Sequence, residues 1–407
     1  MADSATAPLA ADADPVAAAV AHMLTAVNPV TDHEWLALSA ARRRVLARPL
    51  FAQSDSPPAD NSAMDGYALR VADLEAGDRT LPLGQRITAG SRPAHLAPGT
   101  AARIFTGGVV PAGADAVVPQ ERCREVAGRV TIDGAVSLHA NIRRAGEDLQ
   151  AGDEVLAAGE LLRPQALALA ASAGHGRLPV LRRLRVAVLI TGDELVDADQ
   201  PLAAGQIHNS NGPLLAGMLA ELDAMVVDVR HVEDRAQTTR DALASAAEAA
   251  DLVITTGGVS VGEEDHVCPA VEQLGAITLQ GVNLKPGKPV AFGHVGGSVF
   301  LGLPGNPVSL FVTFALLGAP LIRKLQGRHT ACTAPLPLPA GFSRAGGKRD
   351  EYLRVRCTDG RLERFAHQGS GVLGSAQWAT GLARQPAGQS IRKGQTLAYY
   401  PCADLLA

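Results

Sequence analysis

Aromatic side chains are scarce in this 407-residue chain, and several features that mark specialised protein classes are missing. Only 3% of the residues are Phe, Trp or Tyr, so Ala, Val and Leu must fill the cores that a 47% apolar composition permits. The five cysteines are scattered without metal-ligand spacing, which is typical of reduced thiols. The net charge of −4 gives no basic surface for nucleic acid or for an anionic membrane.

Targeting and membrane signals are lacking as well. The Ala/Asp/Pro-rich residues 1–14 carry no basic segment ahead of an apolar one, which argues against a signal peptide and favours a disordered tail. No uncharged apolar run is expected to reach membrane-spanning length. We therefore expect a cytoplasmic protein that binds neither nucleic acid nor membrane.

Several common signatures of nucleotide and metal sites do not occur. There is no phosphate loop ending in Gly-Lys-Ser/Thr, no dinucleotide-binding glycine pattern after a strand and no paired-histidine metal helix. The 11 histidines are dispersed, and each is more often structural than a base. A site of another kind has to be sought in the loops.

Hydrophobic periodicity changes along the chain. Residues 15–50 have helical spacing, including a predicted helix over 33–47, whereas residues 53–150 combine Gly/Pro turns with short β-branched runs. Residues 151–180 return to an Ala/Leu-rich helical pattern. From residue 185 onward, strands and helices alternate, which predicts an α/β unit with a mostly parallel sheet. A Pro-rich linker then leads to the short strands of a small β-domain over 340–407.

The most informative segment is residues 252–265, where a buried strand runs into a glycine turn and then into acids. Gly257, Gly258 and Gly262 let the backbone bend tightly and approach a ligand, with Ser260 between them. Successive N–H groups in such a turn bind anions. Because Asp265 and its acidic neighbours would repel a bare phosphate, a divalent cation such as Mg²⁺ is expected to bridge them. An ordinary strand–turn–helix junction with a solvated acidic tail is the alternative.

Three further loops fall at strand ends of the same unit, where open α/β sheets bind ligands. They are acidic (Thr191, Gly192, Asp193, Glu194), basic (Lys285–Pro289, with Lys285 and Lys288) and Pro-Gly (Pro304, Gly305, Asn306, Pro307). Each has a plain alternative: solvated lysines, carboxylates capping a helix, or Asn306 as a turn former. Ser210 lies in a polar segment that precedes a helix. Their coincidence at one sheet edge favours a site.

Taken in order, these segments resemble the molybdopterin molybdenumtransferase family, which includes the C-terminal part of gephyrin. The resemblance covers nearly the whole chain from about residue 15. The matching segments are Asn61–Ala68, Ile104–Gly107 with Pro111–Val117, Arg143–Gly152, Thr191–Leu195, Thr256–Asp265, Lys285–Pro289, Gly302–Ser309, Arg349–Val355 and Gly369–Ser375. Any one of them is weak, but the ordered set is specific.

The resemblance implies a multidomain α/β plus β fold. Its expected parts are a helical linking domain (15–52 and 151–182), a β-rich domain (53–150), a three-layer α/β molybdopterin-binding domain (183–331) and a C-terminal β-barrel-like domain (332–407). It also implies a homodimer whose active site is shared between subunits, with transient contacts to other cofactor-biosynthesis proteins or molybdoenzymes. The implied reaction takes adenylylated molybdopterin and molybdate, needs Mg²⁺, and releases AMP and molybdenum cofactor.

The resemblance assigns roles to individual residues. Glu194, Asp234 and Asp265 are expected to hold the metal and act on the pyrophosphate, and Lys285 and Lys288 to face molybdate. The expected substrate-binding residues are Thr191, Gly192, Asp193, Ser210, Gly257, Gly258, Ser260, Gly262, Pro304, Gly305, Asn306, Pro307, Arg349 and Ser375, with Asp65, Thr106 and Asp148 supplied by the partner's β-domain.

Three positions depart from the family pattern, and two other functions remain open. Gly281 stands where many relatives have a basic residue, Gly108-Val109 replaces Ala-Pro, and Ala379-Thr380 replaces an Ala-Asn/Asp pair. An enzyme that adenylylates molybdopterin is one alternative, although it is typically a single domain. A non-catalytic cofactor carrier or scaffold is the other. Molybdenum and tungsten are not distinguished.

Overall fold

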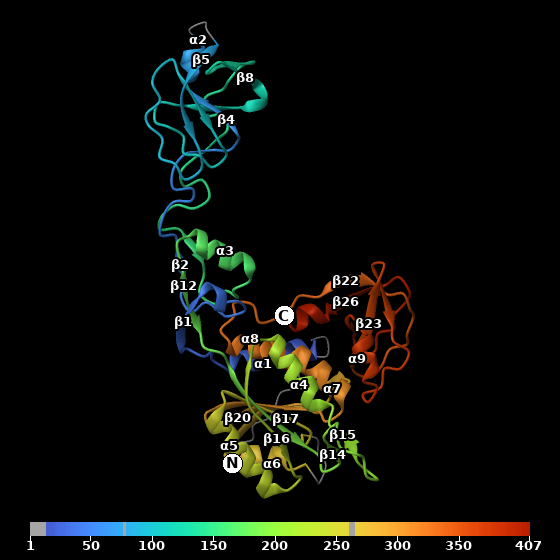
Figure 1. Cartoon of the computed structure of the whole chain (residues 1–407). Coiled ribbons are helices and arrows are strands. Elements are labelled where there is room, and N and C mark those ends of the chain that lie inside the picture. The colour runs from blue at the N-terminus through green and yellow to red at the C-terminus, as the bar shows by residue number, and fades with distance from the viewer. Residues whose placement is uncertain (1–13, 76–78, 260–264) are drawn as a thin grey trace. The chain divides into compact units, whose positions relative to one another are not determined.

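The computed structural model describes residues 14–75, 79–259 and 265–407, and it divides into two compact units (Figure 1). The first unit is built from the described residues up to 34, from 43–45 and from 180–407. The second comprises 35–42 and, where described, 46–179. Apart from Asp14, the predicted tail 1–14 lies outside the described residues, and so do Ser260 and Gly262.

A six-stranded sheet forms the centre of the first unit. Its order is β16 (Met225–Val232), β13 (Arg185–Thr191), β17 (Leu252–Thr256), β21 (Ser298–Leu303), β20 (Ala291–Val295) and β18 (Gly275–Gln280). The first four strands are parallel, and β20 and β18 are antiparallel to their neighbours. Strands buried on both faces need continuous apolar runs, which these sequences supply.

Helices cover both faces of this sheet (Figure 1). On one face, α5 (Ala236–Ala249) and α6 (Val267–Leu274) share a core with Ala187, Val253 and Phe300. On the other face lie α1 (Pro15–Thr25), α4 (Asn211–Glu221) and a long helix made of α7 (Pro307–Thr313), a π turn (Phe314–Gly318) and α8 (Ala319–Leu325). Alternate side chains of each strand therefore enter opposite cores, and the domain has three layers.

The long helix bears on the expectation that no uncharged apolar run reaches membrane-spanning length. Residues Pro307–Leu325 are long and apolar enough to cross a membrane by length and composition. However, 94% of the most apolar window of this helix is buried inside the protein, as in the core helix of a packed domain. Its apolar character is explained by contacts with α1, α4 and the sheet.

A second six-membered sheet lies in the C-terminal part of the first unit, drawn in orange and red in Figure 1. Its order is β19 (Leu284–Lys285), β23 (Asp350–Thr358), β25 (Gly381–Gln385), β26 (Thr396–Pro401) and β22 (Leu336–Pro339), and β24 (Arg361–Arg364) pairs with β23. The short helices α9 (Gly374–Trp378) and α10 (Cys402–Leu405) accompany it. Because β19 belongs to the lysine loop, that loop is hydrogen-bonded to the C-terminal strands.

The second unit has a six-stranded β-sheet with its own core. The order is β7 (Ala116–Pro119), β4 (Gly66–Leu69), β6 (Ala101–Ile104), β5 (Thr80–Ile87), β9 (Arg129–Ile132) and β8 (Cys123–Val126), beside α2 (Val71–Glu75). Two small ladders join β2 (Leu50–Phe51) to β11 (Glu154–Leu156) and β3 (Asn61–Ser62) to β10 (Ile142–Arg143). Helix α3 spans Pro164–Ser172.

The predicted helix over 33–47 is wrong. The structure has strand β1 (His33–Ala37) and a single 3₁₀ turn (Leu38–Ala40), and β1 pairs with β12 (Arg177–Leu181). Helical spacing of apolar residues in this short stretch is outweighed by pairing with a strand that is distant in sequence.

Asp251 anchors the start of the central sheet and gives a stability prediction. Its carboxylate accepts bonds from Arg182 at 2.6 and 2.9 Å and from the Arg185 backbone N–H at 2.9 Å. Burial opposes the charged form, but the hydrogen bonds from Arg182 and Arg185 prevail and lower the pKa of Asp251 to about 2. We expect Asp251→Asn to lower the free energy of unfolding at pH 7 by about 2 kcal/mol.

The lowered pKa of Asp251 determines how the stability of the protein depends on pH. A lowered folded-state pKa stabilises the fold above the unfolded value, near 3.8, and the benefit disappears as pH falls through about 2. Urea unfolding of wild type and Asp251→Asn at pH 7 and at pH 3 should show the difference between them shrinking at the lower pH. A constant difference would mean that the charge of Asp251 is not its cause.

Candidate functional site

The predicted site loops gather at one edge of the central sheet. Strand β17 lies between β13 and β21 and is parallel to both. The residues that follow Thr191, Thr256 and Leu303 therefore leave the sheet at the same edge. The lysine loop precedes β20 rather than following it, but β20 is antiparallel to β21 and pairs Ala291 with Gly302. The start of β20, and with it the lysine loop, therefore lies at the edge where β21 ends.

The glycine turn after β17 packs closely against its neighbours. Gly257 donates its N–H to the Leu303 carbonyl at 2.9 Å, and Thr191 donates its hydroxyl to the Thr256 carbonyl at 3.2 Å. Gly257 and Gly258 have φ values of +91° and +64°. A Cβ on Gly257 would lie 2.6 Å from Thr191 Oγ1, so only glycine fits this crossing.

Three carboxylates converge beside this turn. The Asp234 N–H donates to Asp193 Oδ1 at 3.1 Å, and burial together with the negative charges of Asp193 and Glu194 raises the pKa of Asp234. Asp265 is the first described residue after 260–264, and its negative charge acts together with burial to raise the pKa of Cys268 to about 11. Within the described ranges, no three His, Cys, Asp or Glu side chains are arranged closely enough to form a metal site.

A cavity of about 540 Å³ lies over the lysine loop. Lys285, Lys288 and Arg349 supply three cationic side chains to it, and its remaining lining consists of small and amide residues. Arg349 also donates to the Leu284 carbonyl at 3.2 Å, which ties the C-terminal strands to the loop. The cavity therefore offers cations and hydroxyls to a small anion. Its other lining residues are Pro286, Gly287, Pro289, Ser309, Gln368, Gly369 and Ser370.

The Pro-Gly loop and the start of α4 complete this edge. The Asn211 side chain donates to the Gly305 carbonyl at 2.6 Å, and Gly305 approaches the Gly257 Cα. Asn306 begins α7 without a side-chain cap bond, and Pro307 occupies the first turn. Pro304 is buried and Ser210 is half-buried before α4. These residues thus line the same edge as the glycine turn.

Ser375 lies elsewhere than the sequence suggested. We expected it to reach the anion site, but its side chain is fully buried and does not line the cavity. Its hydroxyl donates to the Val372 carbonyl at 2.7 Å and accepts from Arg354 Nε at 3.2 Å. Arg354 in turn donates to the carbonyl of Gly369, which lines the cavity, so Arg354 links Ser375 to the cavity wall.

Two of the residues predicted to come from the β-domain, Asp65 and Thr106, form a hydrogen-bonded pair in the second unit. Asp65 Oδ1 accepts bonds from the Thr106 N–H and hydroxyl, both at 2.8 Å. These bonds, with the nearby Arg103, lower the pKa of Asp65. Asp148 is exposed, and its backbone N–H donates to the Ser56 carbonyl.

Comparisons with known proteins identify the family. Residues 14–174 match the MoeA N-terminal region (domain I and II), 187–324 match a probable molybdopterin-binding domain, and 336–402 match the MoeA C-terminal region (domain IV). A molybdopterin molybdenumtransferase of Haemophilus influenzae is 40% identical over 79% of this chain and 82% of its own length. The chain belongs to the molybdopterin molybdenumtransferase family.

Other relatives agree. A molybdopterin molybdenumtransferase of Nostoc is 40% identical over 73% of this chain and 70% of its own. The molybdopterin biosynthesis MoeA protein of Pyrococcus horikoshii has a TM-score of 0.82 at 26% identity, over 95% of this chain and 99% of its own. The fold class and the family predicted from the sequence are confirmed. A molybdopterin molybdenumtransferase is supported over the two alternatives, an adenylyltransferase and a non-catalytic carrier.

Some residues of this edge escaped the sequence-based prediction. Asn211 and His231 fix the Pro-Gly loop and the acidic loop, since His231 Nε2 donates to the Gly192 carbonyl at 2.8 Å. Ser309, Gln368 and Ser370 line the cationic cavity. Gln368 to Ser370 overlap the family-like segment Gly369–Ser375, which was the available signal, although spacing alone did not show which side chains face the cavity.

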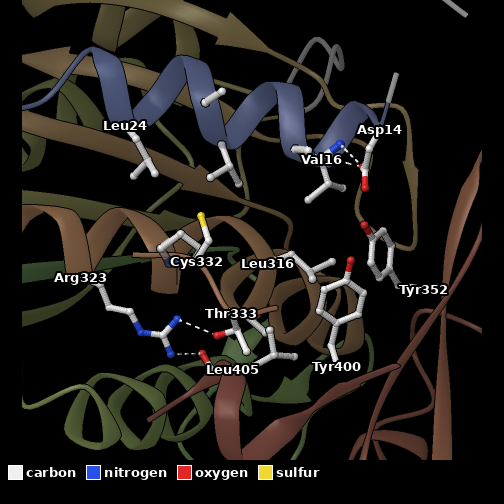
Figure 2. Close-up of a pocket in the computed structure, with 15 residues that line it drawn as sticks. Asp14, Val16, Leu24, Leu316, Arg323, Cys332, Thr333, Tyr352, Tyr400 and Leu405 are labelled. Atoms are coloured by element: carbon white, nitrogen blue, oxygen red, sulfur yellow. Dashed lines mark hydrogen bonds between the residues drawn. The ribbon is translucent and has the colours of Figure 1, made fainter. Parts of the chain in front are cut away.

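A second cavity, of about 320 Å³, is separate in character (Figure 2). It lies among α1, the long helix and the C-terminal strands, and most of its lining is aliphatic. Figure 2 shows the hydroxyls of Tyr352 and Tyr400 near Asp14, while Arg323 donates to the Leu405 carbonyl at 2.8 Å. None of the predicted site residues lines it, so the candidate site is the loop edge and the cationic cavity.

Gly287 gives a direct test of the lysine loop. It has φ of +107°, and a Cβ there would lie 2.3 Å from Thr313 Cγ2 in the long helix. We expect Gly287→Ala to lower the free energy of unfolding by roughly 2–3 kcal/mol and to weaken anion binding in the cavity.

The matched control is Gly296→Ala, because Gly296 also has positive φ but no atom within 4 Å of the built Cβ. Backbone strain alone should cost it about 1 kcal/mol, with anion binding unchanged. Chemical denaturation and molybdate titration of both variants make the comparison. Equal effects in the two would show that packing against Thr313 is unimportant.

Proposed function

We propose that this protein inserts molybdate into adenylylated molybdopterin. The pyrophosphate link is hydrolysed, and AMP and molybdenum cofactor are released. We also propose that the reaction takes place in the cytoplasm and requires Mg²⁺. The transferase family of the chain supports this reaction, and its relatives are named molybdopterin molybdenumtransferases.

The proposal rests on one observation: the glycine turn and the cationic cavity lie next to each other at one edge of the sheet. The glycine turn of Gly257 and Gly258 offers a close backbone approach to a phosphate. The cavity beside the neighbouring strand end offers Lys285, Lys288 and Arg349 to an oxyanion. A substrate with a phosphate at one end and a metal-accepting dithiolene at the other requires this arrangement.

The acidic loop supplies the type of donor that Mg²⁺ prefers, although its described side chains are not already gathered around a metal position. The donors of Asp193, Glu194 and Asp234 are all carboxylate oxygens, and burial together with the negative charges of Asp193 and Glu194 raises the pKa of Asp234. Glu194, Asp234 and Asp265 would hold the ion. When bound, Mg²⁺ would neutralise the phosphates and stabilise charge on the departing AMP.

The protein's own groups have separate tasks in this proposal. Gly257 and Gly258 hold the phosphate end of the pterin, while Lys285 and Lys288 hold molybdate and keep it in place for the dithiolene. Pro304 and Pro307 shape the pocket between them. Because the sulfurs of the substrate bind the metal, no protein nucleophile is needed.

We further propose a homodimer in which Asp65, Thr106 and Asp148 of one subunit complete the site of the other. The exposure of Asp65 and Thr106 supports this, because both residues of this hydrogen-bonded pair are accessible to a partner. The domain limits 15–52 with 151–182, 53–150, 183–331 and 332–407 belong to the same proposal. Transient contact with other cofactor-biosynthesis proteins or molybdoenzymes would deliver the product.

The test is AMP release from adenylylated molybdopterin in the presence of Mg²⁺, with and without molybdate, while active cofactor is followed. Molybdate-dependent AMP release with cofactor formation supports the proposal. Tight substrate binding without AMP release would favour a carrier. ATP-dependent formation of the adenylylated species would favour an adenylyltransferase.

A further inference from the structure

Glu351 is a buried carboxylate directly behind the cationic cavity. Glu351 lies in β23, which pairs in parallel with β19. In that pairing, Glu351 is opposite Lys285. Its side chain is only 3% exposed, whereas that of Lys285 is 46% exposed. Lys285 therefore stands between Glu351 and the cavity that it lines.

The two carboxylate oxygens of Glu351 have unequal surroundings. Oε2 accepts a bond from Arg344 Nη2 at 2.8 Å. Oε1 is buried and accepts no hydrogen bond from any residue that the structure describes, but it lies 3.5 Å from Lys285 Nζ, within ion-pair range. A buried carboxylate is costly unless a cation compensates it, and for Oε1 that cation is the cavity's own lysine.

We propose that Glu351 acts as a built-in competitor that weakens oxyanion binding in the cavity. An anion that enters must share the Lys285 ammonium with a negative charge that cannot leave. Glu351 thus raises the Kd of molybdate, so that bound molybdate can dissociate, and it makes the affinity of the cavity depend on the charge of the anion. This inference rests on the proposed function of the cavity as the molybdate site, but its sign is independent of the reaction.

The direction of the effect separates this role from a merely structural one. Replacing the carboxylate by a neutral amide of the same shape removes one negative charge near the bound anion. At the dielectric of a protein surface, such a change corresponds to a roughly tenfold tighter Kd for a dianion. Loss of structure would instead weaken binding.

Asp350 provides a matched control on the same strand. It is also a buried acid, and its carboxylate pairs with Arg384 at 2.6 Å and accepts the Ala387 N–H at 2.9 Å. Because successive side chains on a strand point to opposite faces, Asp350 faces away from Lys285. Asp350→Asn should reduce stability and leave the Kd for molybdate unchanged.

The experiment measures molybdate binding to the full chain by calorimetry, for wild type, Glu351→Gln and Asp350→Asn, at low and at moderate salt. We expect the Kd of Glu351→Gln to fall roughly tenfold, with a smaller difference at the higher salt. In turnover, the KM for molybdate should fall without a rise in kcat. Unchanged or weaker binding in Glu351→Gln, alongside a wild type that binds, would overturn the inference.

Two safeguards keep the result decisive. If Glu351→Gln does not fold, Glu351→Asp takes its place, because the shorter side chain keeps its charge but draws it back from Lys285. Its Kd should be lower than that of wild type, and equality with wild type would refute the role of Glu351. A wild type that binds no molybdate at millimolar concentration would overturn the assignment of the cavity itself, and the inference with it.

Discussion

Asp234→Asn is expected to lower the rate of AMP release roughly 100-fold or more. The Asp234 carboxylate lies beside Asp193 and Glu194, and burial with these like charges raises its pKa. Such crowding of carboxylates is unfavourable unless a cation joins them. An amide of the same shape keeps the packing but removes the charge that would hold Mg²⁺ and, through it, the phosphates.

The measurement is AMP release over a range of Mg²⁺ concentrations at constant pH. Asp234→Asn should require more Mg²⁺ for half of its maximal rate as well as having a lower maximum. Asp241→Asn, an exposed carboxylate on α5 that pairs with Gln237, is the control and should match wild type. Wild-type rates and Mg²⁺ dependence in Asp234→Asn would refute its assignment as a metal ligand.

The sequence predicted the chemistry of the site better than its geometry. Glycine turns and strand ends are local features, so Gly257 and Asp193 could be placed at one sheet edge from pattern alone. What the pattern could not show was that β20 is antiparallel to β21. That reversal brings the loop before β20 to the same edge, and it depends on pairing between strands rather than on either strand's residues.

Two other features escaped the sequence-based prediction for the same reason. The segment at His33–Ala37 is a strand because it pairs with Arg177–Leu181, a contact that short-range periodicity does not encode. Ser375 was expected at the anion site because its segment resembled the family. The turn before α9 instead places Gln368 and Ser370 on the cavity and buries Ser375 against Arg354. Glu351 was marked by nothing in the sequence beyond its place in Arg349–Val355.

Removing Lys285 or Lys288 is the second prediction with a large expected effect. Both ammonium groups line the cavity of about 540 Å³, and one charge-assisted contact contributes roughly 1.5–3 kcal/mol. Each alanine variant should therefore raise the Kd for molybdate by roughly 10- to 150-fold. Lys288→Ala should leave stability nearly unchanged, whereas Lys285→Ala removes one of the two cations, Lys285 and Arg344, that pair with Glu351 and should be less stable.

This difference between the two lysines makes the pair informative. Molybdate titration measures the loss of binding, and urea unfolding measures the loss of stability, on the same preparations. Lys393→Ala is the control for general charge effects, because Lys393 is exposed in the turn before β26 and does not line the cavity. If Lys393→Ala weakened binding as much as Lys288→Ala, the binding would reflect overall charge. A selective loss would place the oxyanion between the lysine loop and Arg349, where its affinity is set by three cations and limited by the carboxylate behind one of them.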